Sequence, residues 1–266
     1  EAAPDNPALI FRRGQILARL ERYDEALAEF DRVLEEQSVE PQVLLEKADV
    51  LIKLGKFLDA ANAIHQLIAA APDNPGLRLE AARLYLAGER PSKSLEMLNE
   101  LAATESDSWQ VFRLRADAHL NLAQHAEAIR DYDRVLELNP DDAETLNNLA
   151  WLLATSPQDD LRDANRSIEI AVKACELTDY SAPHILSTLA AGYAERGDFE
   201  TAVRWSREAV ALEIKEATEE DDIVEQLRAE LQSYLDGKPW RELLEADEQD
   251  GDGTPVPPRV LGPNDA

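Results

Sequence analysis

Cysteine and histidine are scarce in this chain, and their scarcity limits the chemistry it can carry. The single cysteine, Cys175, excludes an internal disulfide framework and a cysteine-based zinc site. Four histidines are scattered along the chain, with no cysteine or carboxylate cluster beside them at metal-ligand spacing. His119 and His125 are six residues apart, so they do not share one helix face. The sequence therefore predicts no metal site and no cofactor.

Basic side chains are also few. Lys and Arg number 27 against 54 Asp and Glu, for a formal net charge of −27. Nucleic-acid phosphates are bound by basic surfaces, so this charge argues against nucleic acid as a partner, and also against docking on anionic lipid. No apolar run approaches the roughly 18–20 residues of a membrane span, so we expect no membrane insertion.

Glycine is limited to ten residues, and the sequence motifs of catalysis are missing. There is no glycine-rich phosphate loop and no serine in a nucleophile elbow. The stretch from Glu248 to Gly253 resembles the first half of a calcium loop. A complete loop needs a bidentate carboxylate at its twelfth position, where Arg259 stands, so we interpret the stretch as linker. We expect no enzyme active site in this chain.

What the chain does contain is an internal repeat. The segment Arg22–Leu27 recurs in related form at Lys56–Ala60, Gln124–Ile129 and Asp198–Val203. Apolar residues inside the unit follow the spacing of an amphipathic helix. One helix pair cannot enclose its own apolar stripe, whereas stacked pairs can. The small residues that mark the period are 34 residues apart: Ala26, Ala60, Ser94 and Ala128.

This pattern resembles the tetratricopeptide repeat, whose 34-residue unit consists of two antiparallel helices. Small residues also occupy the eighth position, where that family packs its first helix against its second. The resemblance implies an all-α fold, a right-handed superhelical solenoid of antiparallel helix pairs. No strand is expected, because no run alternates with period two. The eighth-position residues are Gly14, Ala48, Ala82, Ala116, Ala150 and Ala190.

The repeat register divides the chain into four parts. Residues 1–6 form a leader, 7–216 hold six repeats, 217–240 form an amphipathic capping helix, and 241–266 form an acidic tail rich in proline and glycine. We expect the tail to be mostly disordered. The repeats are predicted at 7–40, 41–74, 75–108, 109–142, 143–182 and 183–216.

The fifth repeat departs from the others, because residues 155–166 replace the usual short turn between its helices. Surface loops accept extra length at little cost, so the insertion is interpreted either as a tolerated loop or as a partner contact.

In the resembled family, the first helix of each repeat lines a concave groove, mainly through positions 2, 5, 6, 9, 12 and 13. The carboxylate clamp of that family needs Lys and Asn where this chain has Phe11 and Gln15. Its asparagine ladder needs Asn at position 6 of successive repeats, where only Asn148 qualifies here. Neither groove chemistry is therefore expected.

We expect partner contacts on the remaining groove surface, where charges of both signs mix with uncharged side chains. Trp151 is the first choice, since an aromatic anchor flanked by amides is typical of binding hot spots. The alternative is that Trp151 packs against the inserted loop of its own repeat. The predicted partner-binding residues are Trp151, Asn147, Asn148, Arg113, Asp117, Arg83, Leu45, Asp49 and Phe11.

Three functional interpretations follow from these patterns. The first is a non-catalytic scaffold that binds a peptide or protein partner in the groove. The second is a targeting or regulatory arm of a larger multidomain enzyme, such as an envelope enzyme, and the third is a self-association module. The stretch Leu146–Pro157 resembles tetratricopeptide proteins of planctomycete-type bacteria. That resemblance favours a bacterial protein and an extracytoplasmic location over a cytoplasmic one.

Overall fold

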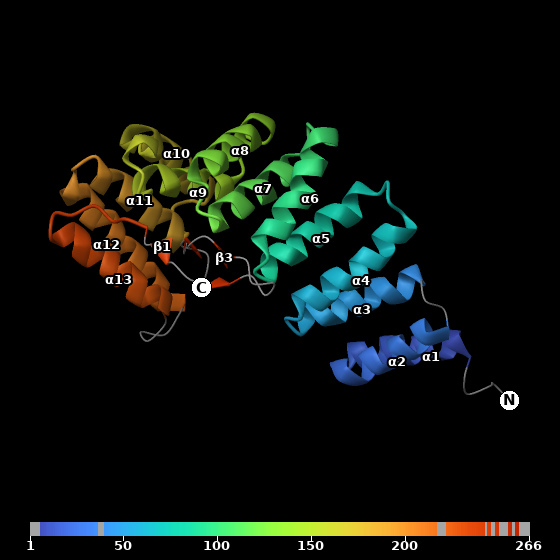
Figure 1. The fold of residues 1–266 in the computed structure, drawn as a ribbon. Coiled ribbons are helices and arrows are strands. Elements are labelled where there is room, and N and C mark those ends of the chain that lie inside the picture. Colours follow the sequence, from blue (N-terminus) through green and yellow to red (C-terminus); the bar gives the residue numbers. More distant parts are fainter. Residues whose placement is uncertain are drawn as a thin grey trace. The chain divides into compact units, whose positions relative to one another are not determined.

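The structure is a computed structural model that describes residues 6–36, 40–216 and 222–242, with the pairs 244–245, 248–249, 255–256 and 259–260 (Figure 1). Over these residues it contains thirteen α-helices, which confirms the predicted all-α fold class. The chain divides into two compact units, Glu1–Ser106 and Asp107–Ala266. No helix in the described ranges is long and apolar enough to cross a membrane.

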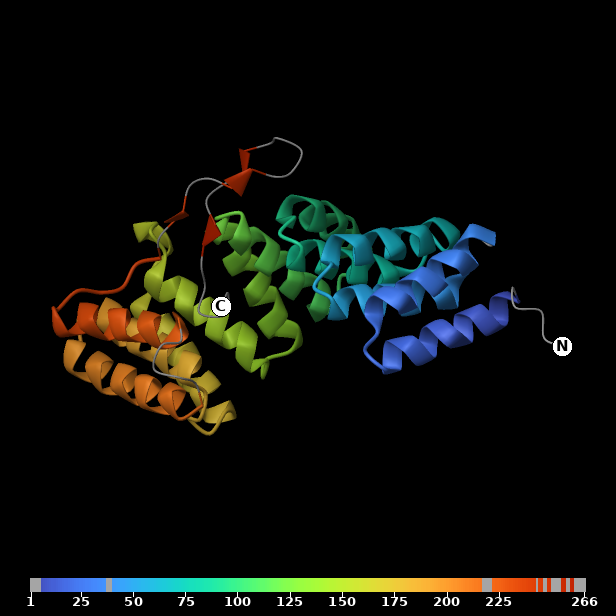
Figure 2. The same ribbon diagram turned by 90° about the horizontal axis from the view of Figure 1, so that it is seen from below.

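Each unit is a stack of helix pairs in which consecutive helices pack against one another. In the first unit the pairs are α1 (Pro7–Arg19) with α2 (Tyr23–Glu36), α3 (Pro41–Lys53) with α4 (Phe57–Ala70), and α5 (Pro75–Ala87) with α6 (Pro91–Thr104). In the second unit they are α7 (Trp109–Asn121) with α8 (His125–Leu138), α9 (Ala143–Thr155) with α10 (Ala164–Leu177), and α11 (Pro183–Glu195) with α12 (Phe199–Glu216). A last helix, α13 (Asp222–Leu235), lies alongside α12 (Figure 2).

Local chemistry explains where the first helix of each pair begins. Pro41 and Pro75 occupy the first turn, where a missing N–H costs no hydrogen bond. Asn6 Oδ1 accepts a hydrogen bond from the Ala8 amide at 3.0 Å, and so satisfies a donor that the helix start leaves open. The first helix of every pair begins at the first residue of the corresponding predicted repeat.

The two helices of a repeat are joined by one recurring turn. The turn places one residue in the left-handed region and closes with the hydrogen bond of a Schellman motif, such as that from the Lys56 amide to the Leu51 carbonyl at 2.8 Å. Successive repeats therefore enter their second helix in the same way. The left-handed residues are Glu21, Gly55, Glu89, Ala123 and Gly197.

The fifth pair lacks this turn for a covalent reason. Its equivalent position is Pro157, whose ring holds φ near −65° and so cannot enter the left-handed region. The chain instead leaves α9 through Ser156 and forms a short 3-10 helix, Asp159–Leu161. Arg162 ties the loop down by donating to the Ser156 carbonyl at 2.7 Å and to Glu195 Oε1 at 2.9 Å. The inserted loop is thus an ordered part of the fold, and a partner contact there stays a prediction.

Small side chains at the eighth position allow the paired helices to approach closely. A Cβ added at Gly14 would stand 2.5 Å from the Phe30 ring, so any larger residue would displace that buried side chain. The second helix carries a small residue opposite this position, which is alanine in most repeats and serine in two. The serine hydroxyl donates a hydrogen bond to the backbone carbonyl of the eighth-position residue. Ser94 does so to Ala82 O at 2.8 Å, and Ser167 to Ala150 O at 2.7 Å.

The chain beyond α13 differs from the expectation. Two antiparallel pairs join β1 (Leu244–Glu245) to β4 (Arg259–Val260) and β2 (Glu248–Gln249) to β3 (Pro255–Val256), although no strand was expected. Strands of two residues are too short to show an alternating pattern in the sequence. Arg241 and Glu242, assigned to the disordered tail, pack onto α9 instead. The rest of that tail prediction lies outside the described residues.

Candidate functional site

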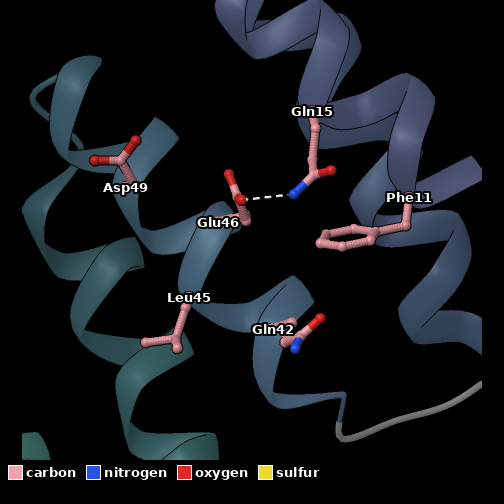
Figure 3. A pocket seen from close by; sticks show the side chains of 6 residues that line it. All are labelled: Phe11, Gln15, Gln42, Leu45, Glu46 and Asp49. Carbon is pink, nitrogen blue, oxygen red and sulfur yellow. Dashed lines mark hydrogen bonds between the residues drawn. The ribbon is translucent and has the colours of Figure 1, made fainter.

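Three of the predicted partner-binding residues meet in one groove of the first unit. Phe11 projects from α1 toward α3, which carries Leu45 and Asp49 (Figure 3). The groove between the two helices has a volume of about 520 Å³. Both are first helices of their repeats, and all three residues stand at positions for which the resemblance predicts groove contacts. Its lining is completed by Gln15, Gln42 and Glu46.

Contacts with α2, and a hydrogen bond between α1 and α3, hold the residues that line this groove in place. The Phe11 ring packs on the ring of Phe30 in α2, with centroids 5.9 Å apart. Gln15 Nε2 donates to Glu46 Oε1 at 2.7 Å, linking α1 to α3. Leu45 remains 49% exposed although it is a large apolar side chain. The groove lining thus combines an open leucine, an aromatic ring and two amides, which offer apolar surface together with hydrogen-bonding groups.

The charged side chains that line the groove, Glu46 and Asp49, are both acidic. Asp49 forms an ion pair with Lys53 one turn later, at 2.7 Å, and this hydrogen bond raises the pKa of Lys53. Both side chains are exposed, so the pair adds little stability. Asp49 and Glu46 nevertheless place two carboxylates along one wall of α3.

The other charged residues of the prediction are engaged within their own unit. Arg83 donates to both oxygens of Glu80, at 2.9 and 2.5 Å. Arg113 lies over the Trp109 ring, 5.7 Å from its centroid, and within 3.6 Å of Asp142 Oδ2. These arginines remain partly exposed, so they are accessible, but neither lines the α1–α3 groove.

Asp117 accepts a hydrogen bond from the Tyr132 hydroxyl at 2.6 Å. Burial raises the pKa of Tyr132 well above its ordinary value, so this hydroxyl keeps its proton and acts as a donor. Asp117 therefore orders the packing of α7 on α8.

The amide and tryptophan residues of α9 are not on an open surface. Asn147 is fully buried, and its Oδ1 accepts from Thr188 Oγ1 at 2.7 Å. Asn148 is half-buried, and its Oδ1 accepts from Asn147 Nδ2 at 3.3 Å. Trp151 is 2% exposed and packs with α11, Tyr234 and Trp240. We expected it either open to a partner or packed on its own inserted loop; the chain after α13 covers it instead.

The predicted partner-binding residues did not include Gln15, Gln42 and Glu46, which complete the lining of the α1–α3 groove. These residues stand at positions 9, 2 and 6 of their repeats, which face the groove in the resembled family, so the repeat register already indicated them. Sequence reasoning also missed Arg241 and Glu242, for which no signal existed, because they lie about 90 residues from Trp151. No group of three or more His, Cys, Asp or Glu side chains within the described ranges is arranged to hold a metal ion.

Comparison with known proteins agrees with this architecture. Family models of the tetratricopeptide repeat match residues 1–41, 51–118 and 109–152, together more than half of the chain. The planctomycete-type resemblance stays a prediction.

Two curated relatives share part of the chain. DnaJ homolog subfamily C member 3 of Bos taurus is 25% identical over 124 residues, or 45% of this chain and 25% of that protein. RNA polymerase II-associated protein 3 of Homo sapiens is 31% identical over 107 residues, or 40% of this chain and 16% of that protein. The chain thus matches a quarter or less of the length of these relatives.

Several solved structures share the fold. The MamA protein aligns with a TM-score of 0.55 at 19% identity, over 68% of this chain and 95% of that chain. YrrB, described as a TPR protein with an unusual peptide-binding site, aligns with a TM-score of 0.52 at 17% identity, over 66% of this chain and 88% of that chain. A tetratricopeptide repeat protein from Parabacteroides merdae aligns over 88% of this chain and 86% of that chain, with a TM-score of 0.53 at 15% identity.

Proposed function

This chain belongs to the tetratricopeptide repeat family, and on that premise we propose that it is a non-catalytic scaffold that binds an extended segment of a protein partner between α1 and α3. The observation that carries the proposal is the open groove lined by Phe11 of α1 and by the exposed Leu45 of α3. A concave site that combines apolar and aromatic side chains with a few polar groups is the usual setting for a binding site.

The lining favours a particular kind of segment. An apolar side chain of the partner would fill the space between Phe11 and Leu45, since burial of that surface drives association. Gln15 and Gln42 would hydrogen-bond the partner's extended backbone. Glu46 and Asp49 would attract lysine or arginine next to the apolar residue, and the net charge of −27 acts in the same direction.

A peptide library displayed on phage tests this proposal. Peptides selected on the full chain should share an apolar residue flanked by lysine or arginine. Their binding should weaken by about tenfold or more on Leu45→Ser, because an apolar anchor contributes about 1–2 kcal/mol or more.

Leu177→Ser is the matched control, since Leu177 is a similarly exposed leucine, at 44%, on α10 of the second unit. Binding should be unchanged there. Selected peptides that tolerate Leu45→Ser as well as Leu177→Ser would place the binding surface elsewhere.

A second candidate is a targeting or regulatory arm of a larger protein. It is favoured by the two curated relatives, which are several times longer than the part this chain matches. The coding sequence on either side of this chain decides it: an adjoining catalytic domain supports the arm, and its absence removes it.

A further inference from the structure

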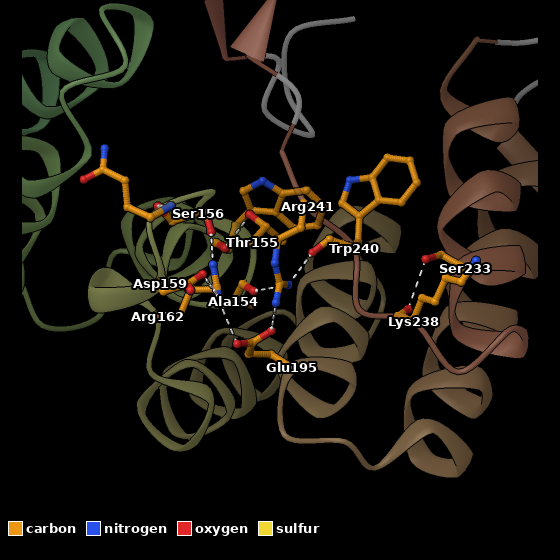
Figure 4. A network of polar contacts seen from close by, with 12 residues as sticks. Ala154, Thr155, Ser156, Asp159, Arg162, Glu195, Ser233, Lys238, Trp240 and Arg241 are labelled. Carbon is orange, nitrogen blue, oxygen red and sulfur yellow. Dashed lines mark hydrogen bonds and ion pairs between the residues drawn. The ribbon is translucent and has the colours of Figure 1, made fainter.

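In the second unit, the chain's own residues Trp240–Glu242, here named the strap, cover part of the surface formed by the first helices α9 and α11. The Glu242 amide donates to the Thr155 carbonyl at 3.1 Å. Arg241 pairs with Glu195 Oε2 at 2.6 Å and reaches the Ala154 carbonyl at 3.4 Å (Figure 4). The strap therefore contacts both α9 and α11.

The Glu242 side chain enters a buried slot between Trp151 and His125. It is 4% exposed, and its Oε1 accepts from the Trp151 indole Nε1 at 3.1 Å. His125 Nε2 lies 4.0 Å from the other oxygen, and its Nδ1 is within 2.9 Å of Ser156 Oγ, which orients the ring. The Trp151 indole thus supplies the buried Glu242 side chain with a hydrogen-bond donor, as a buried polar group requires.

The residues that hold the strap occupy groove positions of the repeat. Trp151, Ala154 and Thr155 stand at positions 9, 12 and 13 of the fifth repeat, and Glu195 stands at position 13 of the sixth. Of these positions, position 9 also lines the open α1–α3 groove of the first unit, as Gln15 and Asp49. The strap thus lies where the repeat architecture would otherwise present a groove to a partner.

The strap has no regular secondary structure of its own. It contains no helix or strand, and the Glu242 amide fastens its backbone to α9. The Arg241–Glu195 pair is partly exposed, and burying the Glu242 charge opposes the gain from its hydrogen bond. Gly237, left-handed at φ +71°, supplies a flexible joint before it. Such a segment can open while the helices beneath it stay folded.

From these contacts we propose that the strap is an internal ligand of the second unit. When it opens, the same slot binds an extended segment of another protein in which arginine is followed by glutamate. The arginine pairs with Glu195, and the glutamate enters between Trp151 and His125. This inference concerns the second unit and does not depend on binding between α1 and α3.

A labelled peptide with the sequence of residues 236–245 probes the slot in trans. Fluorescence anisotropy compares its binding to the full wild-type chain and to the full-length double variant Arg241→Ala, Glu242→Gln. The variant should bind the peptide about tenfold or more tightly than wild type, because the wild-type strap competes at the high effective concentration of a tethered segment. A peptide with glutamine in place of Glu242 should bind neither protein measurably.

Lys238→Ala is the control, since its exposed side chain precedes the strap, and it should behave as wild type. Equal peptide binding by wild type and the double variant, or no binding by a variant with wild-type helical circular dichroism, would overturn the proposal.

Hydrogen exchange of the wild-type chain tests the opening without any substitution. The Glu242 amide should exchange faster than the amides in the middle of α9. Exchange of both at the same slow rate would mean that the strap opens only with global unfolding, which contradicts a displaceable ligand.

Discussion

Glu230 lies in surroundings that are unusual for a glutamate. It belongs to α13, is fully buried against α11, and accepts hydrogen bonds from the Ser187 hydroxyl and, at 3.1 Å, from Gln226 Nε2. Burial raises its pKa to about 7, and the two hydrogen bonds only partly oppose that effect. The hydrogen bond between Glu230 of α13 and Ser187 of α11 therefore involves a carboxyl group whose burial favours the protonated form.

The raised pKa predicts that Glu230 destabilises the fold as pH rises. Between pH 4.5 and about 7 the folded chain holds a proton here that the unfolded chain has lost, so stability falls through that window. Glu230→Gln should remove this loss. At about pH 8 the variant should be more stable than wild type by about 3 kcal/mol, since each tenfold difference in proton affinity is worth about 1.4 kcal/mol.

Urea unfolding at several pH values measures this difference. The wild type and the variant should have nearly equal free energies of unfolding below pH 4.5, where Glu230 is protonated in both the folded and the unfolded chain. A gain that is the same at every pH would show that packing, and not the proton, distinguishes the glutamine.

At the scale of single elements, the turns between paired helices use a left-handed residue that is glycine in only some repeats. Glu21, Glu89 and Ala123 adopt φ values of 54–58° despite their Cβ atoms. The left-handed conformation costs a residue other than glycine roughly 1 kcal/mol. The family turn is therefore kept even where its best residue is missing, because the packing of both helices requires it.

We expect Ala123→Gly to stabilise the chain by about 0.5–1 kcal/mol, because it relieves this conformation. Ala28→Gly is the matched control: Ala28 is exposed inside α2, where glycine should cost about the same amount. Denaturant unfolding compares the two variants with wild type, and destabilisation by both would refute the argument.

At the scale of the whole molecule, the net charge of −27 is the dominant property. Some acids pair locally, as Glu25 does with Arg22 at 2.6 Å, but acids outnumber bases two to one. The excess favours solubility and repels other anions, while it destabilises the folded state through self-repulsion.

Added salt should therefore raise the melting temperature. An increase from about 20 to about 300 mM NaCl shortens the screening length from about 20 to about 6 Å, and we expect a gain of several degrees. Thermal melts followed by circular dichroism measure it, and KCl should act equally, because screening does not depend on the cation. A melting temperature that stays constant or falls would show that local ion pairs outweigh the net repulsion.

Much of the fold was readable in the sequence because it is local and periodic. The 34-residue period, the helix-starting prolines and the small residues at Gly14 and Ser94 all act within one repeat, so they predict the helix pairs directly. The same register placed Phe11, Leu45 and Asp49 on one groove, because neighbouring repeats repeat their geometry. These features determine the family, the fold class and the position of the first-unit groove.

Only the tertiary structure decided what happens to Trp151 and to the chain after α13. No period links Trp151 to Glu242, and no pattern in residues 240–242 distinguishes a packed segment from an exposed one. This contact depends on where α13 ends and on which hydrogen-bond donors, such as the Trp151 indole, then lie next to residues 240–242. The physical reason is that repeat positions specify the geometry of each unit, whereas the occupant of a surface is chosen by non-local complementarity of shape and charge.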